Sequence, residues 1–182
     1  MSNLVEIERL CKHYPLGRRL LHKPDVVRAV EDVSLSIARG HNLGLVGESG
    51  CGKSTLGRAV LRLAEPTSGK VVIDGVDVTA LSGRELTAFR RRAQMIFQDP
   101  YGSLNPRMTV RQTLSEPLRI HRLCKTANEE SQRVVELIQQ VGLPEQSLDR
   151  YPHEFSGGQR QRIVIARALA VDPKLVVADE PV

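Results

Sequence analysis

The stretch of sequence that decides the fold runs from position 43 to position 55 and reads LGLVGESGCGKST. It opens with an apolar run, residues 43–46, and continues into the pattern G-x-x-x-x-G-K-[ST]. Glycines in such a loop let main-chain N–H groups converge on phosphate oxygens, and the start of the following helix adds a partial positive charge. The stretch therefore predicts a strand, a phosphate-binding loop and a helix that begins near Gly52. An ordinary glycine-rich turn with an exposed lysine fits this context poorly.

The side chains of this loop suit a nucleoside triphosphate bound together with Mg²⁺. Lys53 would bridge the β- and γ-phosphates, and the hydroxyl of Ser54 would bind the metal ion. We therefore expect ATP and Mg²⁺ as cofactors, and we expect Cys51 to fill space. The residues of this stretch expected to contact the nucleotide are Gly47, Glu48, Ser49, Gly50, Cys51, Gly52, Lys53, Ser54 and Thr55.

A second apolar run, residues 175–178, ends on the acidic pair Asp179 and Glu180. In P-loop NTPases a carboxylate that follows a strand holds the magnesium shell, and we expect Asp179 to do so. Glu180 beside it would polarise the attacking water as a catalytic base. An isolated acidic pair is commonly just a surface turn, but the phosphate loop upstream disfavours that explanation.

Gln98 directly follows the apolar residues 95–97. This position is the carboxyl end of a predicted strand, where ligands bind in open α/β sheets. The Gln98 side chain would reach the metal ion or its water and assist catalysis. Considered alone, an ordinary loop glutamine explains the residue equally well.

The segment Ser156, Gly157, Gly158 and Gln159 has the spacing of a helix cap. Its two glycines also leave the N–H groups of the first helical turn bare for a phosphate. The segment can serve both as a helix cap and as a phosphate contact. The phosphate could belong to the nucleotide of this chain or of a neighbouring chain.

Tyr14 is a candidate for stacking on adenine, since the chain has few aromatic residues, at 3% of the total. On physical grounds alone, a partly buried structural tyrosine is the simpler explanation.

Hydrophobic periodicity predicts the β-rich first third of the chain. Residues 4–10 and 30–37 are predicted to form strands. In the second strand apolar residues alternate with polar ones, which is typical of an antiparallel sheet with one solvent-exposed face. Asp74 and Gly75 lie between two short apolar runs, and this pair tolerates the positive φ values that a tight hairpin turn requires.

Helices are predicted elsewhere, because capping-box spacings open at Ser82, Thr126 and Ser156. The middle one continues into an apolar stripe at helical spacing that ends at Gly142. The runs 43–46 and 175–178 are of the kind that a parallel sheet buries on both faces. Strands that alternate with helices point to a doubly wound α/β core.

Composition narrows the class of protein. Of the 182 residues, 41% are hydrophobic and 26% charged, as in an ordinary globular protein. No run approaches the ~18 apolar residues of a membrane span, and the N-terminus lacks signal-peptide features, so a cytosolic chain is expected. The three cysteines show no metal or disulfide spacing. The net charge of +5 favours a solvated basic face over nucleic-acid binding, because aromatic residues are scarce.

These motifs together resemble the ATP-binding cassette of ABC transporters over the whole chain. Phe155 to Gln159 is similar to the signature motif, with Phe155 where leucine is more usual. Gln98 resembles the Q-loop glutamine, Tyr14 the A-loop aromatic residue, and Asp179 with Glu180 the Walker B pair. The amino-acid sequences of segments 47–58, 97–107 and 151–155 resemble those of the ATPase subunits of dipeptide, oligopeptide and nickel importers.

The resemblance implies a P-loop NTPase core, which is a mostly parallel sheet with flanking helices, plus an N-terminal antiparallel β subdomain and a helical subdomain. One ATP-binding domain over 1–182 would comprise a β subdomain with the phosphate loop at about 1–80, a helical subdomain at about 108–155, and the signature helix with the Walker B strand at about 156–182.

The same resemblance implies partners. Two ATPase subunits would face head to tail as a homo- or heterodimer, and closure would drive separate transmembrane permease subunits that take up peptides or nickel from a solute-binding protein. The chain would then lie at the cytoplasmic face of the membrane. The segment 99–107, after the Q-loop, would lie near the permease contact.

The sequence departs from the family pattern at one place. In the family, a D-loop and a strand with a switch histidine follow Walker B, and that strand lies between the phosphate-loop and Walker B strands. None of the histidines, which are His13, His22, His41, His121 and His153, follows Glu180. We therefore expect this chain alone to be marginally stable and a poor ATPase.

Two alternatives follow. One is a nucleotide-binding module that acts only by partner contact. The other is a DNA-repair ATPase. Such proteins carry long coiled-coil segments between the phosphate loop and the signature motif, and this interval shows no sustained heptad repeat, which disfavours the alternative.

Overall fold

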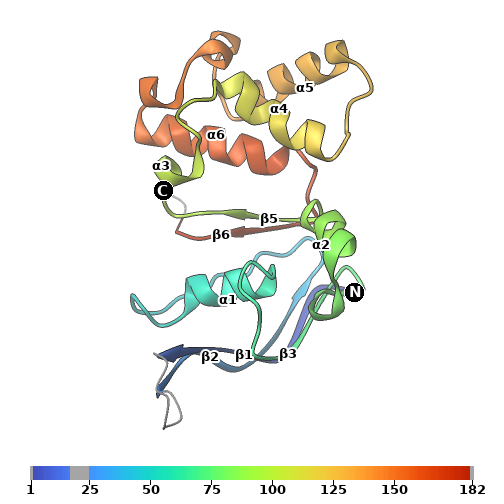
Figure 1. Cartoon of the computed structure of the whole chain (residues 1–182), viewed down its shortest axis with the longest axis vertical. Helices are drawn as coiled ribbons and strands as arrows, with labels where there is room; N and C mark the ends of the chain where they lie inside the picture. The colour runs from blue at the N-terminus through green and yellow to red at the C-terminus, as the bar shows by residue number, and fades with distance from the viewer. Residues whose placement is uncertain (1, 17–24, 181–182) are drawn as a thin grey trace. The chain divides into compact units, whose positions relative to one another are not determined.

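The computed structural model describes residues 2–16 and 25–180. It divides the chain into two compact units, Met1–Arg90 and Arg91–Val182. Figure 1 shows the elements of each unit. The finer subdomain boundaries expected near residues 80, 108 and 156 stay predictions.

The first unit is built on an antiparallel sheet of strand order β2-β1-β3-β4. This confirms the two long strands and the antiparallel arrangement predicted from sequence, although both strands extend further than the apolar pattern indicated. The strands are β1 (Asn3–Leu16), β2 (Asp25–Ala38), β3 (Ser68–Ile73) and β4 (Val76–Asp77).

The predicted hairpin joins β3 to β4. Asp74 has φ 51° and Gly75 has φ 77°, so both central residues of the turn adopt the positive φ values of a type I′ turn. A 3₁₀ turn, η1 (Val78–Ala80), and helix α2 (Gly83–Arg90) follow.

Helix α1 (Lys53–Val60) packs against β1 and β2 through buried residues that include Leu56 and Ala59. The predicted strand at 43–46 is absent: residues 41–48 have no regular structure, and Val46 is 98% exposed. A strand forms only where a neighbour pairs its N–H and C=O groups, and no described strand pairs with this segment. The prediction of a buried strand here is therefore wrong for the described residues.

The second unit contains the parallel pair β5 (Ala93–Ile96) and β6 (Leu175–Ala178). Its helices are α3 (Pro100–Ser103), α4 (Val110–Ile120), α5 (Ala127–Gln140) and α6 (Gly157–Leu169), with 3₁₀ turns η2 (Glu145–Asp149) and η3 (Pro152–Glu154). Strand β6 is confirmed, but its predicted burial on both faces is wrong, because alternate residues are exposed. Its one partner among the described strands is β5.

Local signals set the ends of the helices. Ser156 and Gln159 form the predicted capping box of α6. Thr126 caps α5 by accepting from the N–H of Glu129, whose carboxylate accepts instead from the N–H of Lys125. Gly142, with φ 72°, ends α5 as predicted. No helix in the described part of the chain combines the length and apolar character needed to cross a bilayer.

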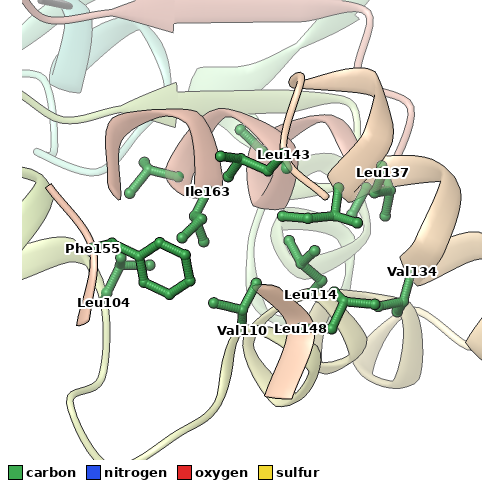
Figure 2. Close-up of a cluster of buried hydrophobic side chains, with 14 of the residues drawn as sticks. Leu104, Val110, Leu114, Val134, Leu137, Leu143, Leu148, Phe155 and Ile163 are labelled. Atoms are coloured by element: carbon green, nitrogen blue, oxygen red, sulfur yellow. The ribbon is translucent and has the colours of Figure 1, made fainter. Parts of the chain in front are cut away.

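The core of the second unit lies where α4, α5 and α6 meet (Figure 2). Leu114, Leu137 and Ile163, one from each helix, are each fully buried. Phe155, the residue before the cap of α6, packs into the same cluster. The apolar stripe predicted for α5 is thus buried on its neighbours.

We predict that Leu114→Ala strongly destabilises this unit. A Leu→Ala change at a fully buried site costs about 2–5 kcal/mol, because transfer energy is lost and a cavity remains. The matched control is Ile120→Ala on the same helix, where the side chain is 64% exposed and the cost should stay near or below about 0.5 kcal/mol. Urea unfolding curves measure both. Equal losses for the two variants would contradict this packing.

A second prediction concerns the ion pair between α4 and α5. Arg119 donates hydrogen bonds to both carboxylate oxygens of Glu130, with a shortest distance of 2.7 Å. These bonds hold the pKa of Glu130 below its usual value of 4.5. Because the pKa is lowered in the folded state, the stabilisation is complete above the unfolded pKa and is lost as pH falls through the folded pKa.

Glu130→Gln should therefore cost less than about 1 kcal/mol near neutral pH, and the difference from the parent chain should vanish in acid. Unfolding free energies measured between neutral pH and about pH 3 test this. Glu136→Gln is the control, since its ion pair with Arg133 lies within one helix and its side chain is 63% exposed. A stability difference for Glu130→Gln that does not change with pH would count against this linkage.

Candidate functional site

The loop at 47–52 adopts the glycine-dependent shape that its sequence predicts. Gly50 and Gly52 have φ of 82° and 101°, in the region that favours glycine. A Cβ added to Gly52 would lie 2.1 Å from the carbonyl oxygen of Ala29 on β2, so no larger residue fits there. Glycine therefore allows both the backbone conformation of the loop and its close approach to the sheet.

Helix α1 begins directly after this loop, as predicted. Gly52 is its N-cap residue and provides no side-chain cap, and the first turn contains no acidic residue. The first N–H groups of a helix have no acceptors within the helix, and together they carry a partial positive charge. Ser54 and Thr55 lie in this turn and are half-buried.

The ammonium group of Lys53 is held against the loop. Its Nζ donates to the carbonyl oxygens of Gly47 at 2.7 Å and Glu48 at 2.9 Å. The positive charge of Lys53 and the N-terminus of α1 therefore lie at the same loop. This arrangement favours binding of a polyanion there. The Sγ atom of Cys51 fills the space beside Gly47, where an added Cβ would come within 2.7 Å of it.

In the second unit, the carboxyl ends of β5 and β6 bring the predicted polar residues together. The N–H of Asp179 donates to the carbonyl of Ile96 at 2.9 Å, which extends the pairing past the end of β6. Asp179 is 7% exposed, whereas Gln98 and Glu180 are exposed. The Nε2 of Gln98 donates to Oε2 of Glu180 at 2.6 Å. Residues far apart in sequence therefore form one polar edge.

Glu180 occupies an unusual backbone conformation, with φ 45°. Such left-handed conformations are uncommon outside glycine, asparagine and aspartate and cost free energy. The carboxylate of this residue nevertheless meets the Gln98 amide.

The signature segment opens α6 with an exposed first turn. The Ser156 side chain accepts from the N–H of Gln159 at 3.3 Å, and the Gln159 side chain accepts from the N–H of Ser156 at 3.0 Å. A Cβ added to Gly157 or Gly158 would meet nothing within 4 Å, and neither residue has a positive φ. Nothing described in this chain therefore requires glycine there, while the open surface admits a ligand.

Tyr14 lies near the end of β1 and is 40% exposed. The Nζ of Lys12 lies 4.6 Å from the centre of its ring. The ring is therefore accessible enough to stack on a planar ligand, and the alternative of a partly buried structural tyrosine stays open.

Arg160 and Tyr101 are two residues of this region that the sequence did not indicate. Arg160 is 9% exposed, its Nε donates to the carbonyl of Pro152 at 2.6 Å, and its guanidinium stacks 4.1 Å from the Tyr101 ring centre. No local pattern could have identified this pair, because the two residues approach only through the contact of α3 with α6.

Comparison with known proteins agrees with these features. The family model described as ABC transporter matches residues 30–182. The chain is 55% identical to the oligopeptide transport ATP-binding protein OppF of Bacillus subtilis (strain 168) over 182 residues, which are 100% of this chain and 58% of that protein. It is 50% identical to the probable peptide ABC transporter ATP-binding protein y4tS of Sinorhizobium fredii, over 98% of this chain and 51% of that protein. The chain thus spans just over half the length of these relatives.

Solved structures show the same fold. The dimeric structure of the cassette MJ0796 in a post-hydrolysis state, bound to ADP and Pi, superposes with a TM-score of 0.85 at 33% identity, covering 97% of this chain and 74% of that one. CbiO1 from Clostridium perfringens, part of the ABC transporter complex cbiONQ, gives a TM-score of 0.79 at 25% identity, covering 100% of this chain and 66% of that one. These matches confirm the predicted α/β cassette class, and with the family model they show that the chain belongs to the ABC transporter family.

Proposed function

We propose that this chain binds MgATP at the loop 47–55 and hydrolyses it in the service of transport. The observation that carries the proposal is the convergence of the Lys53 ammonium and the uncapped start of α1 on one glycine loop. A polyphosphate supplies acceptors for the helix N–H groups and a counter-charge for the lysine. The exposed ring of Tyr14 is proposed to stack on the adenine.

We propose that side-chain oxygen atoms hold the metal ion, since oxygen atoms are the ligands that Mg²⁺ prefers. We assign direct coordination to the hydroxyl of Ser54, and contacts to the ion or its water shell to Asp179 and the Gln98 carboxamide. When bound, Mg²⁺ would neutralise charge on the phosphates. The donor types fit the ion, and these roles are proposals for each residue separately.

Glu180 is proposed as the general base. Its carboxylate accepts a hydrogen bond from Gln98 at 2.6 Å, which orients it at the edge of the strand pair. From there it would take the proton of the water that attacks the γ-phosphate.

The exposed start of α6 is proposed as a second phosphate contact. Gly157 and Gly158 leave the first-turn N–H groups open, and no internal contact explains these glycines. We assign this surface, with Ser156 and Gln159, to the ATP of a second ATPase subunit that faces the chain head to tail. The dimeric structure of the related MJ0796 cassette supports this arrangement.

The transported solute is proposed to be a peptide. Relatives whose names refer to peptide or oligopeptide transport are 50–55% identical over nearly the whole chain. In this proposal the chain lies at the cytoplasmic face of the membrane and engages permease subunits, which receive the peptide from a solute-binding protein.

Removal of the lysine charge tests the nucleotide site. We expect Lys53→Ala to weaken MgATP binding at least tenfold, since a hydrogen bond to a charged group is worth about 1.5–3 kcal/mol. Calorimetric titration measures the affinity. Lys70→Ala is the control, because Lys70 pairs with Asp77 on the β3–β4 hairpin, away from the loop, and should leave binding unchanged. Unaltered affinity in Lys53→Ala would remove the loop from the nucleotide site.

Removal of the proposed base separates binding from turnover. In a full-length version, Glu180→Gln should lower the rate of phosphate release at least about 100-fold while MgATP affinity stays within about threefold, because general-base catalysis contributes at least that much. Glu136→Gln, on exposed helix surface, is the matched control. If the parent chain binds MgATP with a stoichiometry near one and releases no phosphate, a nucleotide-binding module acting by partner contact becomes the better description.

A further inference from the structure

A cluster of metal-binding side chains lies in the first unit, on the strand pair β1–β2. The Sγ of Cys11, a ring nitrogen of His13 and a carboxylate oxygen of Glu31 all lie within 4.8 Å of one another. None of these residues is assigned to the nucleotide site above. No metal-ligand spacing around Cys11 is visible in the sequence, because the three ligands come from two strands.

An irregularity of the strand pairing lies at the cluster. The register steps from Leu10–Val33 to Lys12–Val30, so that Cys11 alone lies opposite Glu31 and Asp32. Asp32 has φ 48°, as expected for a bulged residue. A bulge redirects side chains, and here it turns the Glu31 carboxylate towards the face of β1 that carries Cys11 and His13.

The contacts within the cluster already position two of the ligands. His13 Nε2 and Glu31 Oε2 lie 2.7 Å apart. The N–H of Asp32 donates to Cys11 Sγ at 3.3 Å, which holds the sulfur beside the bulge. The thiol and imidazole are partly buried, and the Glu31 side chain is 48% exposed, so an ion can enter from solvent.

We propose that Cys11, His13 and Glu31 form a zinc-binding site. Zn²⁺ takes thiolate, imidazole and carboxylate ligands at about 2.0–2.3 Å in tetrahedral geometry, which places ligand atoms roughly 3.5 Å apart. His13 Nε2 and Glu31 Oε2, which lie 2.7 Å apart, have to separate to reach this spacing, and the half-exposed Glu31 side chain leaves room for that movement. Binding releases the Cys11 thiol proton to solvent, the His13 nitrogen that faces Glu31 coordinates without a proton, and a water completes the fourth position. The sulfur and nitrogen donors exclude Mg²⁺ and Ca²⁺, which require oxygen ligands.

One neighbouring charge opposes the ion. The Nε of Arg28 lies 3.8 Å from Glu31 Oε2 and competes with a cation for that carboxylate. The competing explanation of the cluster is a plain His13–Glu31 ion pair beside a small apolar cysteine. The two explanations differ in what they predict for Cys11, since only a zinc site requires its sulfur.

Metal titration of the chelator-treated chain tests the proposal. Zn²⁺ should bind at one equivalent in the micromolar range or tighter, and Co²⁺ should give tetrahedral visible bands with a thiolate charge-transfer band. Cys11→Ser should abolish that band and weaken zinc at least tenfold, and His13→Gln should weaken zinc similarly. Arg28→Gln should strengthen zinc binding severalfold. The matched controls, Cys124→Ser and His121→Gln, should bind zinc like the parent chain.

A measurement on the unaltered chain guards against a variant that fails to fold. Zinc should slow alkylation of Cys11 at least tenfold, read by mass spectrometry of the peptides, with little change at Cys124. A parent chain that binds no zinc at micromolar concentration would overturn the site. So would zinc affinity that is unchanged in a folded Cys11→Ser variant, or Cys11 alkylation that zinc does not slow.

Discussion

The main-chain N–H groups at the start of α1 are the constraint on which the rest of the molecule depends. The helix begins at Gly52 without a side-chain cap, and such groups need an acceptor. Strand β2 decides where the helix can begin, because the Ala29 carbonyl occupies the space of any Cβ on Gly52. Ala29 is itself an extra residue in the β1–β2 register, between the pairs Lys12–Val30 and His13–Arg28. The irregular strand and the phosphate loop therefore fit each other as one unit.

Elements whose determinants lie within a few residues could be predicted from the sequence. The Asp74–Gly75 turn and the capping box of α6 are set by local backbone chemistry, and both form as expected. The apolar stripe of α5 is likewise local in sequence, although its burial depends on α4 and α6. The segment 43–46 shows the limit of this approach. An apolar run indicates what a strand would bury, but pairing depends on a neighbour that local sequence does not specify.

The candidate site could be predicted as a set of residues, but not as a set of contacts. Gln98 and Glu180 were each expected at the end of a strand, and the parallel pairing of β5 with β6 then brings their side chains within 2.6 Å. The Cys11 cluster had no sequence signal, because a bulge shifts the register by one residue and changes which side chains share a face. Roles that depend on register across strands therefore needed the structure.

Two arginines of α6 connect this helix to α3, and so connect the two surfaces of the second unit that are proposed to contact nucleotide. Arg160, near the start of α6, stacks on Tyr101, and Arg167, near its end, donates to the carbonyl of Ser103 at 2.9 Å. Both partners lie on α3, which begins two residues after Gln98. Since α6 is held to α3 near both of its ends, a displacement of one helix is transmitted to the other. A shift of the Gln98 edge would consequently be passed on to the exposed glycines that open α6, and a shift of those glycines to the Gln98 edge.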